Sequence, residues 1–266
     1  IVDPAGDLTI SAGSLTLSNV NTYVGVTTIN SGATLYLTGS GSIATSSGVV
    51  NNGTFDISGT TSGATIATLS GSGNTVLGAR TLTIASANGT YSGVMSGTGG
   101  LTITTGTLTL SATNTYSGST TILAGILSVT TDVNLGAVPG SFTTNSLVIN
   151  GGGLLANATF TLSPNRGVTF GSNGATINVA GSYELTYAGV IAGAGDWTKV
   201  GTGRLILQGS NTFSGLTTIT AGVVRAQNSA ALGTTDAGVI VRPSGALELS
   251  SVVSGNPISI GAETLT

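Results

Sequence analysis

Apolar and polar residues alternate in short segments along most of the chain. The segments that show this alternation include Ser14–Leu17, Thr34–Leu37, Thr54–Ile57, Thr81–Ile84 and Thr107–Leu110. Successive side chains of a β-strand point to opposite faces, so Leu and Ile would face a core while Thr would face outward. Gly, Asn and Ser lie between the segments, where tight turns form. No stretch of ten or more residues has a helical pattern, and the sequence therefore predicts an all-β fold.

A nine-residue phrase occurs three times, at residues 21–29, 114–122 and 211–219. It reads Asn-Thr-Tyr-Val-Gly-Val-Thr-Thr-Ile, then Asn-Thr-Tyr-Ser-Gly-Ser-Thr-Thr-Ile, then Asn-Thr-Phe-Ser-Gly-Leu-Thr-Thr-Ile. The copies start 93 and 97 residues apart, and similar segments precede and follow each of them. Repetition at such a spacing is typical of a solenoid, in which each unit buries its apolar face against its neighbours.

Two all-β architectures fit this pattern, a β-sandwich and a parallel β-helix. A sandwich requires hairpin turns, yet Asn-Gly pairs such as those at 52–53 and 88–89 do not recur in step with the strands. The regular superperiod favours the β-helix, and coils of about 20–25 residues would place roughly four coils in each superperiod of about 95 residues. We therefore predict a single β-helix segment over residues 1–266, with superperiods 1–92, 93–188 and a truncated 189–266.

The repeated segments resemble the passenger-associated repeat of bacterial autotransporters and related large surface proteins. The pattern of that repeat is a glycine-rich turn, Leu-Thr-Lys, Gly-Thr-Leu-Thr-Leu, Asn-Thr-Tyr-x-Gly-x-Thr-Thr and Ala-Gly-x-Leu. The third copy, Gly189–Leu249, is the most similar and includes the lysine at Lys199. The resemblance implies a right-handed parallel β-helix (a β-solenoid) that is exported and displayed at a bacterial surface. It implies a scaffold and no particular activity.

Charged residues are scarce, with six basic and nine acidic side chains among 266 residues. A nucleic-acid-binding protein needs clustered Lys and Arg, so nucleic acid is not expected as a partner. Charged residues make up 6% of this chain against about 25% in ordinary soluble proteins. A surface this neutral favours coverage by other copies of the chain, end to end or side by side, or by neighbouring repeats of a longer chain. No apolar run reaches the roughly 18 residues of a membrane-spanning helix.

The residue types that most enzymes use are missing, since the chain has no His and no Cys. Ser-His-Asp and Cys-His arrangements are therefore impossible. The carboxylates are spread along the chain at Asp3, Asp7, Asp56, Asp132, Glu184, Asp196, Asp236, Glu248 and Glu263. Calcium-binding glycine-aspartate repeats work in tandem, and Gly193–Asp196 is isolated, which favours a simple turn. We expect no enzyme activity, no cofactor and no metal. Thr-x-Thr pairs lack the fixed coil spacing of an ice-binding face.

The repeated phrase supplies the candidate site residues, and we interpret it as structural. The set is Asn21, Tyr23, Gly25, Asn114, Tyr116, Gly118, Asn211, Phe213 and Gly215. If the copies lie four coils apart, their aromatic rings are roughly 19 Å from one another, too far to stack as one binding platform. An aromatic side chain packed over a turn once in each superperiod is the favoured interpretation.

The expected function is mechanical. The first hypothesis is a structural module of an extracellular or cell-surface bacterial fibre, with the molecules assembling end to end into filaments. The alternative is the passenger stalk of an autotransporter-like adhesin that mediates surface attachment. Both place the chain outside the cell, secreted or at the bacterial surface. Because neither end has a polar capping segment, we expect either further repeats or end-to-end stacking.

Overall fold

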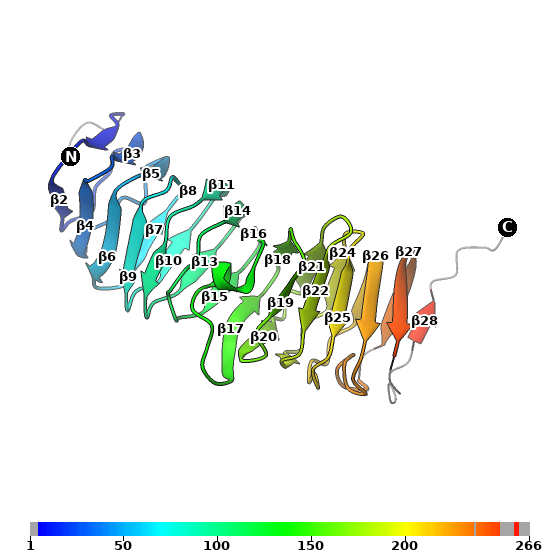
Figure 1. Cartoon of the computed structure of the whole chain (residues 1–266). Helices are drawn as coiled ribbons and strands as arrows, with labels where there is room; N and C mark the ends of the chain where they lie inside the picture. Colours follow the sequence, from blue (N-terminus) through cyan, green and yellow to red (C-terminus); the bar gives the residue numbers. More distant parts are fainter. Residues whose placement is uncertain (1–4, 237, 251–257, 261–266) are drawn as a thin grey trace. The chain divides into compact units, whose positions relative to one another are not determined.

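The computed structural model describes residues 5–236, 238–250 and 258–260. The chain divides into two compact units, residues 1–127 with 133–137 and residues 128–132 with 138–266. Each unit is a stack of coils, and the strands of one coil pair in parallel with the strands of the next (Figure 1). A single short 3-10 helix, η1 (Asp132–Leu135), interrupts the strands of the described residues.

The first unit repeats a coil of three sides. One coil consists of β5, β6 and β7, and the next begins with β8, which pairs with β5. The strands of this unit are β1 (Leu8–Ile10), β2 (Ser14–Leu17), β3 (Val26–Ile29), β4 (Thr34–Gly39), β5 (Gly48–Asn51), β6 (Thr54–Thr60), β7 (Ala64–Ile66), β8 (Leu69–Ser70), β9 (Asn74–Gly78), β10 (Leu82–Ile84), β11 (Ala87–Tyr91), β12 (Met95–Gly97), β13 (Leu101–Ile103), β14 (Gly106–Leu110) and β15 (Thr120–Ile122).

The second unit is built in the same way. Strand β16 (Ile126–Val129) and η1 contain residues of both units. The strands that follow are β17 (Thr143–Ile149), β18 (Gly153–Ala156), β19 (Phe160–Leu162), β20 (Arg166–Phe170), β21 (Ala175–Val179), β22 (Glu184–Tyr187), β23 (Ile191–Ala192), β24 (Trp197–Val200), β25 (Arg204–Leu207), β26 (Thr217–Ala226), β27 (Val239–Leu249) and β28 (Ile258–Ile260).

Coil length varies along the chain. In the first unit Leu82 pairs with Ala64, 18 residues earlier. In the second unit Leu185 pairs with Phe160, 25 residues earlier. The predicted parallel β-solenoid is confirmed, and the β-sandwich alternative is excluded because its neighbouring strands would be antiparallel.

Alternation explains the core. In β10, Leu82 and Ile84 are buried and Thr83 between them is half-buried. Residues in register on successive coils form columns, and Ile84 pairs with Ile66 on one side and Ile103 on the other. Each fully buried aliphatic side chain contributes about 1.5–3 kcal/mol of burial free energy. The columns therefore supply much of the attraction between coils.

The first two copies of the repeated phrase lie in different sheets of the first unit. Thr27 belongs to β3, in the sheet of order β1-β3-β5-β8. Thr120 belongs to β15, which pairs with β13 in the sheet that also contains β10 and β7. The two copies start 93 residues apart, and because they lie in different sheets this offset is not a whole number of coils. For the same reason the aromatic residues Tyr23 and Tyr116 do not form one column.

Candidate functional site

The asparagine of the phrase links neighbouring coils. The Asn114 side chain accepts a hydrogen bond from the Met95 backbone N–H at 2.8 Å and donates one to the Asn134 carbonyl at 2.7 Å. Those partners lie 19 residues before it and 20 after it. Asn211 makes the corresponding two bonds at 2.8 and 2.6 Å. Asn21 donates to a carbonyl of the following coil at 3.2 Å. All three side chains are buried, so the amide replaces water as the partner of backbone groups.

The tyrosines of the first two copies are fully buried and bonded to a threonine four residues later. The Tyr23 and Thr27 hydroxyls are 2.6 Å apart, and those of Tyr116 and Thr120 are 2.7 Å apart. Burial raises the pKa of Tyr23. The rings are therefore parts of the core with a satisfied polar end, and they are not exposed for ligand binding.

The third copy has lost this hydrogen bond. Phe213 stands in place of tyrosine, and the buried Thr217 hydroxyl has no hydrogen-bond partner. Phe213 instead packs against Trp197 and Phe170, with ring centroids 6.0 Å from each. Trp197 is itself buried, so its ring belongs to the core of the second unit.

Restoring the missing hydroxyl is expected to stabilise the chain. Phe213→Tyr would place a phenol four residues before Thr217, as in the other copies, and raise the free energy of unfolding by about 0.5–1.5 kcal/mol. Fluorescence of Trp197, the one tryptophan, follows the unfolding of the second unit in denaturant. In the Thr217→Val background the gain should disappear. A fall in stability with Thr217 intact would contradict the prediction.

The glycine of the phrase is required by close approach to the preceding coil. A Cβ built on Gly118 would overlap the Gly99 carbonyl oxygen, so no larger side chain fits there without a shift of the backbone. Gly25 and Gly215 face backbone carbonyls of the preceding coil in the same way. The glycine contact thus recurs in all three copies, the two asparagine bonds recur in the second and third, and the Tyr–Thr contact recurs in the first and second. The structural interpretation of all nine residues stays a prediction.

Aspartates take part in the turns beside two of the copies. The Asp7 carboxylate accepts a hydrogen bond from the Val26 N–H at 2.7 Å, and Asp196 accepts one from the Leu216 N–H at 2.8 Å. The Asp196 carboxylate, at the end of the Gly193–Asp196 turn, therefore links its own coil to the next one. Asp3 and Glu263 lie outside the described residues. Among the residues that are described, no three acidic side chains come together as a metal site would require.

Lys199 is a feature of the third copy that the sequence did not single out as a site. Its side chain is fully buried in β24. The ammonium group donates to the carbonyls of Val200, Gly201 and Gly203 at 2.8–2.9 Å and to that of Ala221 at 3.3 Å. Burial lowers its pKa from 10.5 to about 8. The lysine joins two consecutive coils, where the other copies have Ile10 and Ile103.

The lowered pKa of Lys199 predicts a pH dependence of stability. Between pH 8 and 10.5 the unfolded chain retains the proton that the folded chain has released, so the free energy of unfolding rises with pH in this window. The increase is at most about 3 kcal/mol. Buried tyrosines have raised pKa values and act in the opposite direction. The measurement is therefore the difference between the wild type and Lys199→Met, followed by Trp197 fluorescence. A difference that does not change with pH would contradict the prediction.

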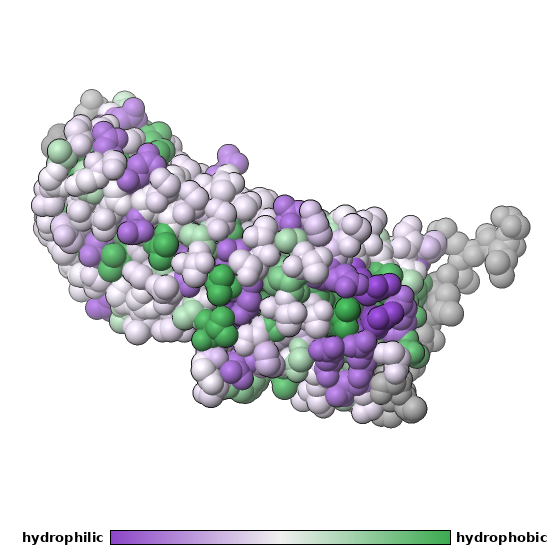
Figure 2. Space-filling view, viewed as in Figure 1, coloured by the Kyte–Doolittle hydropathy of each residue, from purple (hydrophilic) through white to green (hydrophobic). Residues whose placement is uncertain are grey.

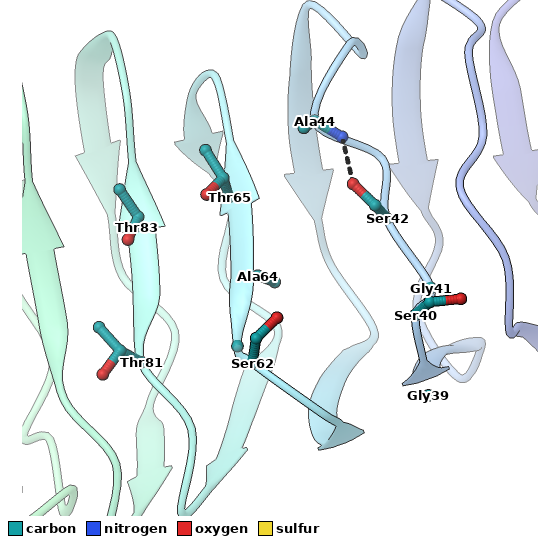
Figure 3. Close-up of a pocket in the computed structure, with 11 residues that line it drawn as sticks. Gly39, Ser40, Gly41, Ser42, Ala44, Ser62, Ala64, Thr65, Thr81 and Thr83 are labelled. Atoms are coloured by element: carbon teal, nitrogen blue, oxygen red, sulfur yellow. Dashed lines mark hydrogen bonds between the residues drawn. The ribbon is translucent and has the colours of Figure 1, made fainter.

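A shallow groove of about 240 Å³ on the first unit is lined by small and hydroxyl-bearing residues. Ser40, Ser42 and Ser62 border it together with Thr65 and Thr83, which are in register on β7 and β10 (Figure 3). The lining contains no charged and no aromatic side chain. It offers no acid, base or nucleophile activated by a neighbour, and it therefore gives no basis for a catalytic reaction.

Ion pairs gather on the second unit. Arg204 contacts Glu184 at 2.8 Å and Glu248 at 3.2 Å, and Arg225 contacts Glu248 at 2.7 Å. Figure 2 shows strongly hydrophilic residues over the C-terminal strands of this unit. In the described part of the first unit the charged side chains are Asp7, Asp56 and Arg80 alone. No helix in the described part of the chain is long and apolar enough to span a membrane.

The fold and the repeated contacts define a class of protein, the parallel β-solenoids built from passenger-type repeats. Three segments, residues 10–37, 105–129 and 198–226, match the family described as the passenger-associated-transport-repeat. The chain therefore carries autotransporter passenger repeats, and the resemblance predicted from its sequence is confirmed. Each matched segment contains one copy of the repeated phrase.

A curated relative supports the same family. The Adhesin BmaC autotransporter of Brucella suis biovar 1 (strain 1330) is 35% identical over 235 residues, which cover 79% of this chain. The chain spans about 7% of the length of that protein. No solved structure matches the chain.

Proposed function

We propose that the chain is a stretch of the passenger β-solenoid of an autotransporter-like adhesin, secreted or displayed at a bacterial surface. Its role is that of a mechanical, non-enzymatic scaffold that holds binding regions away from the cell. The observation that carries this proposal is that the repeated phrase makes its hydrogen bonds to neighbouring coils of the same chain. Asn114 and Asn211 each bond to the coil before and to the coil after their own, so the phrase serves the stacking of coils.

The finer architecture is part of the same proposal. We propose a right-handed solenoid, as in the family that the chain resembles, with superperiods 1–92, 93–188 and 189–266. We also propose roughly four coils in each superperiod of about 95 residues, which the longer of the observed coils, at 25 residues, supports. The nine residues of the phrase act as structural positions, with no catalytic, cofactor or metal role.

Assembly into a fibre is the second candidate function. The low charge supports it. Like charges keep protein molecules apart, and the described part of the first unit has only three charged side chains, so repulsion between two copies would be weak. In this arrangement copies associate end to end or side by side, and filaments carry the mechanical role. Neighbouring repeats of a longer chain would cover the same surfaces in the adhesin.

Two experiments test these proposals. Antibodies raised against the chain should label intact source cells, and external protease should remove the label. Labelling that requires cell lysis would contradict surface display.

Electron microscopy of native material then separates the two candidates. Projections attached to cells by one end support the adhesin stalk, and continuous filaments with an axial repeat support the fibre.

A further inference from the structure

The coil that contains β17 departs from the regular register. Thr143 pairs with Arg166, but the next paired residues are Leu147 and Val168. Three residues of β17 therefore lie opposite one residue of β20, which forms a bulge. Asn145 lies in this bulge with φ of 56° and is the one non-glycine residue of the described chain with positive φ. Bulges of this kind redirect side chains, and strained backbone is frequent at functional sites.

The bulge borders a groove of about 320 Å³ on the second unit. Phe142 forms one wall, and its side chain is 48% exposed in a chain whose other phenylalanines and tryptophan are mostly buried. A Cβ on Gly167 would lie 2.7 Å from the Thr143 carbonyl oxygen of β17 and 3.2 Å from Cζ of Phe142. The glycine therefore lets both the bulged β17 and the Phe142 ring lie close to the backbone of β20, while about half of Phe142 stays exposed.

Polar groups stand beside this aromatic wall. The Thr169 hydroxyl donates to Oδ1 of Asn145 at 2.7 Å, which fixes the orientation of the amide. The exposed Thr144 adds a second hydroxyl to the lining. No side chain that lines the groove is ionisable. The groove on the first unit also has hydroxyls, but it has no aromatic side chain.

We propose that this groove binds a neutral saccharide of one or two pyranose rings. A pyranose has a face of C–H groups, which are attracted to the negative face of an aromatic ring such as Phe142. Its hydroxyls donate to and accept from threonine and asparagine side chains. The absence of charge in the lining disfavours phosphate, carboxylate and cationic ligands. The inference does not depend on where the chain is located, and it adds a ligand site to a segment proposed as a scaffold.

The test is saturation-transfer NMR on the 266-residue chain. The probes are methyl glycosides of glucose, galactose, mannose and N-acetylglucosamine at millimolar concentration. We expect saturation transfer to the ring protons of at least one of them. Titration of that glycoside should show a weakening of about fivefold or more in Phe142→Ala, because the stacking contact is lost.

Matched variants separate binding from folding. Tyr183→Ala removes another exposed aromatic side chain of the second unit, outside the groove, and should leave binding unchanged. Asn145→Gly keeps the positive φ, removes the amide, and should weaken binding without lowering stability. Phe142→Leu keeps apolar bulk without the ring, and it tests the stacking contact if Phe142→Ala does not fold. No transfer to any probe, or binding that is equal in the wild type and in folded Phe142→Leu, would overturn the proposal.

Discussion

Replacing Asp132 with Ala is expected to lower the free energy of unfolding of the second unit by about 3–5 kcal/mol. Asp132 accepts a hydrogen bond from Nε of Arg166 at 2.8 Å, and the two side chains are 10% and 3% exposed. The guanidinium also lies 3.4 Å from the Asp132 carbonyl. The substitution leaves a buried cation without its counter-charge, which costs more than the pair itself contributes.

Trp197 fluorescence during denaturant unfolding measures this loss, since Trp197 lies in the same unit. The double variant Asp132→Ala, Arg166→Met removes both charges and should recover part of the stability. Arg204→Ala is the matched control, because it breaks ion pairs whose side chains are one-third or more exposed. Solvent screens those pairs, and we expect a smaller loss. Equal losses in the two single variants would refute the expectation.

Replacing Asn114 with Ala is expected to destabilise the first unit by about 2–4 kcal/mol. The substitution removes the acceptor of the Met95 N–H and a donor to the Asn134 carbonyl, in a place that water does not reach. Buried polar groups that lose their partners carry the full cost of their desolvation. Both coil contacts of this side chain are lost together.

Hydrogen exchange measures this effect locally, because solenoids lose structure coil by coil. The Met95 amide should exchange faster in Asn114→Ala, and far-UV circular dichroism should give the loss of global stability. Asn88→Ala replaces an exposed asparagine of β11 and serves as the control. The structural interpretation of the phrase would be wrong if Asn114→Ala left the exchange of Met95 unchanged.

Local rules made most of the fold predictable. The alternation of Leu or Ile with Thr can be recognised within a single strand, without knowledge of its neighbours, and strands such as β10 and β13 show it. The repeat spacing then indicated stacked coils. Coil lengths, however, are unequal, with paired residues 18 apart in one place and 25 apart in another. This variation decides which sheet receives each copy, and it cannot be read from the spacing of the phrase alone.

The candidate residues were predictable as a group, but their partners were not. Asp132 and Arg166 are 34 residues apart in an irregular part of the chain, and nothing in either local sequence predicts the pair. The threonine four residues after each aromatic residue was visible in the phrase. Its hydroxyl contact depends on side-chain direction within the core, which period-two alternation leaves open. The groove beside Phe142 depends on the bulge in β17, a feature without a sequence signal.

The placement of the first two copies in different sheets has a consequence for how such a chain grows. The contacts of the phrase involve only the coils next to its own, since Asn114 is bonded to the coil before it and to the coil after it. These contacts do not require the phrase to lie in one particular sheet. A duplicated segment therefore need not contain a whole number of coils to be accommodated. Gene duplication and deletion are correspondingly free to lengthen or shorten the chain in unequal steps, with each new copy bringing its own attachment to its neighbours.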